Sequence, residues 1–210
     1  STEIGGSYCT RLLADLGAEV LMIEPPNGHP LRFHGPFPDD REDPEQSGLF
    51  LHLCANKQGL TLDLNSKLGA SKILELVGQA DLVVETFKPG HMEKIGLDFN
   101  VLSAIQPHLV LTSISHFGQY GPYSEWEGEE IVDYALGGYM YFGGSPDREP
   151  LMVSNNQAQL QAGVQSAIAS LSAVWEARRN GKAQHVDACS VEAMLSVHSW
   201  THSLWTHQGT

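Results

Sequence analysis

The sequence of 210 residues has few cysteines, few cations and no long apolar run. Its three cysteines, Cys9, Cys54 and Cys189, are far apart and form no C-x-x-C pair, which argues against a disulfide framework or a cysteine-based metal site. Free thiols of this kind indicate a reducing compartment, so we expect a cytoplasmic protein. No apolar stretch approaches the roughly 20 residues that span a bilayer, and no signal-peptide pattern is present.

The charge balance is acidic. Twelve Lys and Arg face 25 Asp and Glu, which gives a formal net charge of −13. A protein that binds nucleic acid or anionic membranes needs a basic surface, so we expect neither partner. A small phosphorylated ligand is not excluded, because a few local cations suffice to bind it.

The common nucleotide and hydrolase motifs are absent from the chain. No G-x-G-x-x-G joins a strand to a helix, and neither a P-loop nor a G-x-S-x-G elbow occurs. His198 and His202 are four residues apart, a spacing that can hold zinc on one helix face. The hydrolytic motif needs Glu directly after the first His, where this chain has Ser199. With two tryptophans nearby, packing is the preferred interpretation, and we expect no metal.

The composition is that of a globular domain, with 41% hydrophobic and 18% charged residues. We expect residues 1–210 to form a single large domain. The chain opens on a helix and a strand without an initiator Met and closes beside a helix. We therefore expect it to be a segment of a longer protein.

Hydrophobic patterning predicts alternating strands and helices. Short apolar strands are expected at 19–23, 60–64, 81–85, 109–115 and 184–190, and the main helices at 7–16, 66–80, 129–140 and 157–180. Near-continuous apolar strands are typical of a parallel sheet covered on both faces. The pattern predicts an α/β fold with a doubly wound parallel sheet and a ligand at the carboxyl ends of its strands.

Two segments that follow predicted strands carry candidate binding residues. In "ETFKPGHMEKIGL" (85–97), Thr86, Phe87, Lys88 and Lys94 supply a hydroxyl, an aromatic face and two cations, which suit an adenine ring beside phosphates. A plain Pro-Gly turn with solvated lysines explains this segment equally well. In "SISHFGQYGPY" (113–123), His116 is a residue that titrates near neutrality, although a solvent-facing loop histidine is the commoner case.

The segment "SNNQAQLQ" (154–161) is unusual for the start of a helix. It holds two asparagines, three glutamines and no charge, and it leads into a small-residue helix containing Gly163. The first turn of a helix favours carboxylates, because its free N–H groups carry partial positive charge. The plain structural interpretation is that Asn155 or Asn156 caps the helix and that glutamine side chains satisfy its backbone groups.

Five segments in order resemble the family III CoA-transferases, also called the CaiB/BaiF family. They are "LLADLGAEVLMIEPPNG", "NKQGLTLDL", "DLVVETFKPGHMEKIGL", "SISHFGQYGPY" and "RRNGKAQHVDACSVEAML". The resemblance implies a Rossmann-like large domain and an interlaced homodimer. It also implies a CoA thioester as ligand and a carboxylic acid as second substrate. Transferases of the family use an aspartate that forms an acyl anhydride and then an aspartyl-CoA thioester, whereas racemases use acid–base residues.

Carried over to this chain, the resemblance assigns several ligand-binding positions. Leu62 and Phe87 fall where transferases hold the adenine, and Arg32 matches a typical family arginine. Lys94 replaces a phosphate-binding arginine and so keeps the charge without the two-pronged geometry. Four further positions depart from common family residues: Asn65, Thr86, Ser115 and Phe117.

The most consequential departure is Gln159. The family aspartate lies four residues before the glycine that here is Gly163, and a carboxamide cannot act as its nucleophile. One hypothesis is an enzyme that obtains an acid from elsewhere, such as a partner chain. A second is a non-catalytic half of a tandem protein whose other half carries the aspartate. A third is a racemase-like enzyme, for which His116 is a speculative base.

Overall fold

The structure is a computed structural model that describes residues 3–198 and 200–209, apart from the side chain of His202. Its helices are α1 (Ile4–Asp15), α2 (Gly48–Cys54), α3 (Lys67–Val77), α4 (His91–Lys94), α5 (Phe99–Ile105), α6 (Glu130–Leu136), α7 (Tyr139–Phe142), α8 (Gln157–Asn180), α9 (Ser190–Ser196) and α10 (Thr201–Gln208). Its strands are β1 (Leu21–Glu24), β2 (Gln58–Thr61), β3 (Leu82–Glu85), β4 (Val110–Ser115) and β5 (Gln184–Cys189). Short 3-10 turns, η1 (Pro30–Phe33) and η2 (Pro38–Asp40), lie in the loop before α2.

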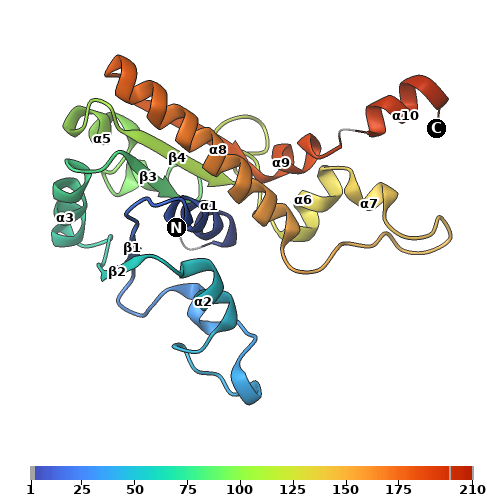
Figure 1. The fold of residues 1–210 in the computed structure, drawn as a ribbon, viewed down its shortest axis with the longest axis horizontal. Helices are drawn as coiled ribbons and strands as arrows, with labels where there is room; N and C mark the ends of the chain where they lie inside the picture. The colour runs from blue at the N-terminus through green and yellow to red at the C-terminus, as the bar shows by residue number, and fades with distance from the viewer. Residues whose placement is uncertain (1–2, 199, 210) are drawn as a thin grey trace.

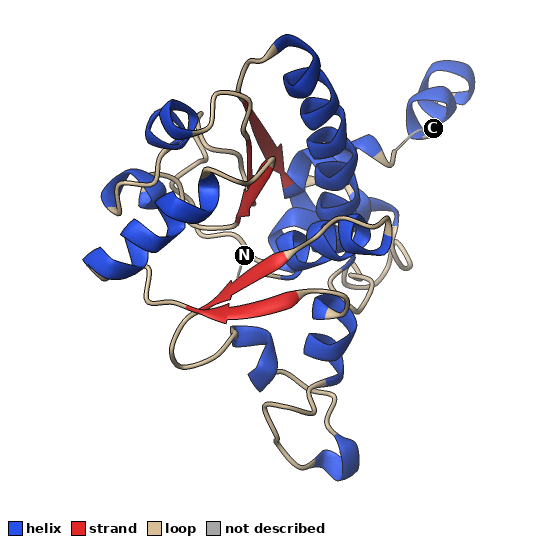
Figure 2. Ribbon diagram, turned by 60° about the vertical axis from the view of Figure 1, so that its left-hand side comes forward, coloured by secondary structure: helices blue, strands red, loops and turns tan. Residues whose placement is uncertain are grey.

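All the pairings between these strands are parallel, which confirms the α/β class. β3, β4 and β5 form one sheet with β4 in the centre. β1 and β2 form a separate pair, and Figure 2 shows the two sheets apart. The strands predicted for the doubly wound sheet thus fall into two groups within the described chain. All four residues of β2 are exposed. Within the described chain, nothing packs over this strand as neighbouring elements pack over a central strand of a parallel sheet.

Helices cover both faces of the three-stranded sheet, as a doubly wound arrangement requires (Figure 1). Val110 packs with Ala173 and Ala177 of α8, and the Oγ1 of Thr112 lies 2.7 Å from the Oγ of Ser170 on the same helix. The opposite face packs against α3, α5 and the segment between them, in a cluster of Val77, Leu97, Leu102, Leu109 and Leu111. Cover on both faces explains why the first five residues of β4 are all buried, Thr112 and Ser113 included.

Helix α8 crosses α1 in direct backbone contact. The buried residues of α8 are alanines, serines and one glycine, which lets the two helices approach closely. A Cβ on Gly163 would lie 2.7 Å from the carbonyl oxygen of Gly5 and 3.2 Å from the backbone nitrogen of Cys9. The crossing places the first turn of α8 beside the first turn of α1, and this fixes the position of Gln159.

We expect Gly163→Ala to destabilise the protein. Overpacking costs about 1–3 kcal/mol, and alanine returns about 1 kcal/mol as helix propensity, so a net loss of up to about 2 kcal/mol should appear in urea unfolding. Gly78→Ala is the control, because a Cβ there meets its nearest atom at an ordinary 3.5 Å. Equal stability of Gly163→Ala and the unchanged protein would contradict the close crossing.

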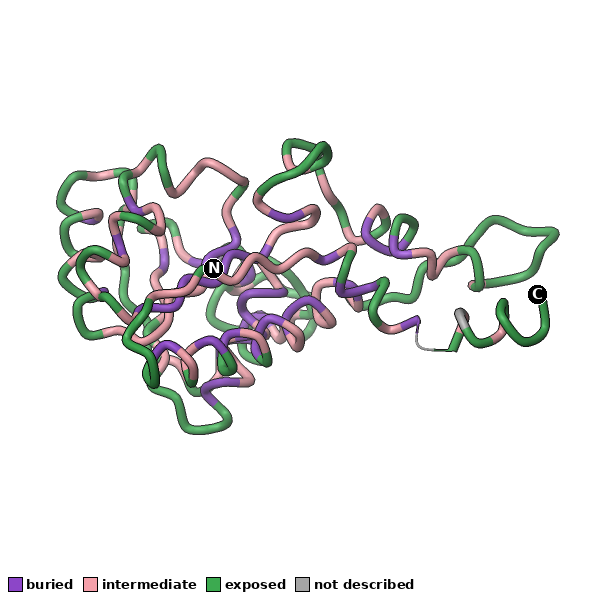
Figure 3. Tube along the Cα trace, turned by 90° about the horizontal axis from the view of Figure 1, so that it is seen from above, coloured by how far each residue is buried: buried purple, intermediate pink, exposed green. Residues whose placement is uncertain are grey.

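Two parts of the chain lie outside this core. The loop before α2 packs on that helix through a cluster of Leu31, Phe50, Leu53 and Cys54. The C-terminal part, with α7 and α10, projects from the body and is largely exposed (Figure 3). Tyr141 and Trp205 on these helices are 88% and 70% exposed.

Candidate functional site

A cavity of about 140 Å³ lies where β3 and β4 end. It is lined by Thr86 and Phe87, which follow β3, and by Ser115 and Phe117 at the end of β4. Parallel strands bring these four positions together from two segments that are about 30 residues apart. The structure thus gathers four of the nine sites assigned by the resemblance, at the edge of the sheet where α/β proteins hold their ligands.

The other sites assigned by the resemblance do not line this cavity. Leu62 follows β2, and its N–H donates to the carbonyl of Glu24 at 2.8 Å. Asn65 lies in the turn before α3, where its N–H donates to Asp63 at 3.0 Å. Lys94 is the last residue of α4. Leu62 and Asn65 lie between β2 and α3, and Lys94 lies at the end of the short α4, so these positions remain predictions.

Arg32 lies in η1 and forms a two-pronged ion pair. Its Nε lies 2.7 Å from Oε2 of Glu24, and its Nη2 lies 3.1 Å from Oε1 of the same carboxylate. The guanidinium also lies 3.9 Å from the ring centre of Phe50 and contacts Glu45. The Arg32 hydrogen bond holds the pKa of Glu24 below its ordinary value. These contacts give Arg32 a structural role in this chain.

Gln159 lies in the first turn of α8, where the capping group comes from another helix. The carboxylate of Glu130 accepts from the N–H of Ala158 at 2.7 Å and from the N–H of Gln159 at 3.2 Å. Asn156 occupies the N-cap position of α8, but its side chain makes no hydrogen bond to the helix. The carboxylate expected at this helix start is present, and Glu130 supplies it from α6. This leaves position 159 free to hold an amide, whose Oε1 accepts from the N–H of Gly5 at 3.4 Å.

His116 is paired with a buried carboxylate rather than facing solvent. Its Nδ1 lies 2.8 Å from Oδ2 of Asp133, and the two side chains are 18% and 0% exposed. Sequence reasoning missed both Glu130 and Asp133. Their spacing of three residues on the predicted 129–140 helix was the available signal, because such residues share a helix face.

Glu3, His116, Glu130 and Asp133 form a cluster of partly buried titratable groups, and burial shifts their pKa values. Burial raises the pKa of Glu3, Glu130 and Asp133 above their ordinary values. Burial opposes the charged form of His116 as well, but the hydrogen bond to Asp133 and its negative charge outweigh this and raise the pKa of His116. Shifted groups beside a cavity are characteristic of functional sites.

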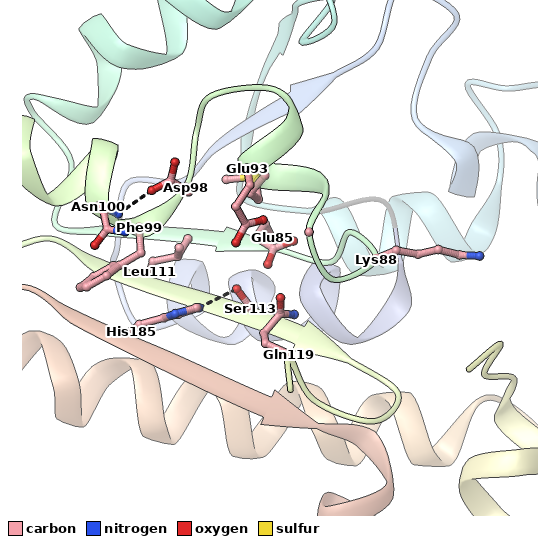
Figure 4. A pocket seen from close by; sticks show the side chains of 12 residues that line it. Glu85, Lys88, Glu93, Asp98, Phe99, Asn100, Leu111, Ser113, Gln119 and His185 are labelled. Atoms are coloured by element: carbon pink, nitrogen blue, oxygen red, sulfur yellow. Dashed lines mark hydrogen bonds between the residues drawn. The ribbon is translucent and has the colours of Figure 1, made fainter. Parts of the chain in front are cut away.

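A second cavity of about 240 Å³ lies under the β3–α4 segment (Figure 4). Ser113 in β4 lies 2.9 Å from Nε2 of His185 in β5, and the buried Glu85 lies on the same side of the sheet. Glu85 accepts from the N–H of Phe87 at 2.6 Å, which shapes the turn that carries Phe87 into the first cavity. Burial raises the pKa of Glu85 and lowers that of His185. Glu85, which lines the second cavity, thus helps to position Phe87 in the first.

No group of three potential metal ligands occurs among the described residues. His198 packs against Tyr139 and Phe142, and its Nε2 lies 2.6 Å from the carbonyl oxygen of Gly137. The side chain of His202, the other half of the suspected pair, lies outside the described residues. The packing interpretation holds for His198. Within the described chain, no helix combines the length and apolar composition needed to cross a membrane.

Comparison with known proteins identifies the family of this chain. The sequence profile of CoA-transferase family III matches residues 1–210. This chain belongs to CoA-transferase family III. It is 33% identical over 204 residues to the succinyl-CoA:(R)-benzylsuccinate CoA-transferase subunit BbsE of Thauera aromatica, covering 97% of this chain and 50% of that protein. It is 35% identical over 196 residues to the succinyl-CoA–D-citramalate CoA-transferase of Chloroflexus aurantiacus, covering 92% and 48%.

Solved structures of the family share the fold. A CaiB/BaiF family protein from Brucella suis superimposes with a TM-score of 0.89 at 34% identity, over 99% of this chain and 55% of that one. The chain thus spans about half the length of the family III relatives it matches. The fold expected from the resemblance is confirmed.

Proposed function

We propose that this chain binds a CoA thioester in the cavity at the ends of β3 and β4. The observation that carries the proposal is the convergence of Thr86, Phe87, Ser115 and Phe117 on that cavity. These are positions at which the family resemblance places CoA contacts. An aromatic face and hydroxyl groups at the carboxyl end of a parallel sheet suit the adenine and the pantetheine amides.

We propose further that the complete protein acts in CoA transfer between carboxylic acids, in the cytoplasm and as an interlaced homodimer or beside a second related domain. Its relatives are named for such transfers. The amide of Gln159 cannot form the anhydride, so in this proposal the partner or the second domain supplies the nucleophilic aspartate. The alternative of a non-catalytic half is favoured by the same residue, whose amide is held by Gly5.

Calorimetric titration with CoA tests the binding proposal. We expect saturable heat with the unchanged protein and at least about fivefold weaker binding for Phe87→Ala, since loss of a ligand-stacking aromatic costs about 1–3 kcal/mol. Phe33→Ala is the matched control, because Phe33 is exposed and lies in η1, away from this cavity. No heat with CoA, or equal affinities of Phe87→Ala and Phe33→Ala, would contradict the proposed site.

A further inference from the structure

His116 and Asp133 form a buried pair that CoA transfer by a carboxylate nucleophile does not require. Asp133 comes from α6, and His116 follows β4, so the pair joins two elements of the fold. The hydrogen bond of 2.8 Å commits Nδ1 of the histidine to the carboxylate. The second oxygen, Oδ1 of Asp133, is buried and has no hydrogen-bond partner among the described residues. His116 is therefore the hydrogen-bond partner of the Asp133 carboxylate among the described residues.

The imidazole ring is also held sterically. A Cβ on Gly128 would lie 2.1 Å from Cγ of His116 and 2.3 Å from its Cβ. Only glycine lets the 121–129 loop lie on the ring in this way. Within the described chain, Nε2 of His116 has no hydrogen-bond partner. The ring is thus fixed in place by Asp133 and Gly128, while one nitrogen stays available.

The available nitrogen belongs to a residue that lines the proposed CoA cavity. His116 shares that cavity with Phe87, Ser115 and Phe117. A water molecule occupies about 30 Å³ in the liquid, so a cavity of about 140 Å³ has room for water beside part of a ligand. Gln159 cannot accept the acyl group. What this site still offers for a reaction is a base, His116, and a cavity that can hold water.

We propose that His116, oriented by Asp133, is a general base that activates water to hydrolyse the thioester of a bound acyl-CoA. The proposal rests on the proposed CoA binding. Water gives a proton to Nε2 while its oxygen bonds to the thioester carbonyl carbon, and Asp133 stabilises the imidazolium as a positioning residue. The C–S bond then breaks, and the leaving thiolate takes the proton from Nε2. The products are a carboxylic acid and free CoA.

The pH dependence of the reaction reports on the pair. Hydrolysis needs neutral His116, and its pKa is raised, so the rate should increase with pH through a midpoint above the ordinary 6.5. Four carboxylates act on the ring: Asp133, Glu3, Glu130 and Glu127. Asp133→Asn removes the strongest of them. That variant should move the rising limb to lower pH, an effect that a merely structural role would not produce.

The test measures free CoA by chromatography after incubation with succinyl-CoA or acetyl-CoA, with calorimetric CoA binding recorded on the same samples. We expect His116→Ala and His116→Asn to lose at least about 100-fold in rate while CoA affinity stays within about twofold. His116→Asn keeps a donor for Asp133 and so guards against a folding defect. His52→Ala is the control, because His52 is exposed on α2.

The possible outcomes separate the two proposals. Equal hydrolysis by His116→Asn and the unchanged protein would overturn the role of His116. So would a protein that releases no CoA but, in D2O, exchanges the hydrogen next to the thioester carbonyl, as observed by NMR. That result would assign the pair to proton exchange. Failure to bind CoA would overturn the proposed function itself, and the hydrolysis with it.

Discussion

Arg32→Met should lower the free energy of unfolding by about 3–5 kcal/mol, the cost of leaving a nearly buried charge without its partner. Glu24 is 8% exposed and would lose both prongs of the guanidinium, while methionine fills part of the same space. Urea unfolding followed by circular dichroism measures the loss. The free energy of unfolding of Arg32→Lys should lie between those of the unchanged protein and Arg32→Met, because an ammonium keeps the charge but cannot form the two-pronged ion pair. Arg41→Met is the control at an exposed arginine in the same loop.

The effect of Arg32→Met should depend on pH in a defined direction. Because the pKa of Glu24 is lowered in the folded protein, the stabilisation is complete above about 4.5 and is lost as the pH falls through the lowered value. The difference between the two proteins should therefore narrow in acid. Unchanged stability at pH 7 together with weakened CoA binding would instead place Arg32 on the ligand, as the resemblance implies.

The elements of the fold were predictable where a local pattern determines them. Helix α8 was predicted at 157–180 and has these bounds, because its small buried residues recur at helical spacing. The helix predicted from residue 66 is α3, which Ser66 caps by accepting from the N–H of Gly69 at 3.0 Å. Strand β4 was predicted at 109–115 and spans Val110–Ser115. Short-range signals of periodicity and capping suffice for such elements.

Contacts between distant segments were not predictable in this way. The sequence does not reveal that β1 and β2 pair apart from the other three strands. It also hides the capping of α8 by Glu130, because the partners are 28 and 29 residues apart. Seen alone, the amides at the start of α8 indicate a missing charge, whereas the fold supplies that charge from α6. The pairing of His116 with Asp133 was missed for the same reason.

Glu130 also changes the meaning of Gln159. The carboxylate of Glu130 accepts a hydrogen bond from the backbone N–H of Gln159. A second carboxylate at position 159 would therefore lie beside it. Two neighbouring carboxylates repel, and this raises the pKa of at least one of them. An amide avoids that repulsion and still offers a hydrogen-bond donor to a ligand. The loss of the nucleophile is thus compatible with a stable first turn of α8.

Gln159→Asp is expected to convert the chain from one that forms no covalent intermediate to one that carries CoA. By the family chemistry, the new carboxylate attacks the thioester of succinyl-CoA and forms an anhydride and free thiolate. The thiolate then attacks the enzyme-side carbonyl and releases succinate. Mass spectrometry should show a species heavier by CoA less one water. Hydroxylamine should remove it, because the bond is a thioester.

Two variants of the same residue serve as controls for that gain. Gln159→Asn keeps an amide and should give no adduct, and Gln159→Glu carries a carboxylate that is one methylene longer and should give less. Adding Glu130→Gln to Gln159→Asp removes the neighbouring charge, so the adduct should form at lower pH than with Gln159→Asp alone. CoA binding without any adduct in Gln159→Asp would show that the chain lacks more of the transfer site than its nucleophile. It would then favour a binding half whose partner performs the transfer.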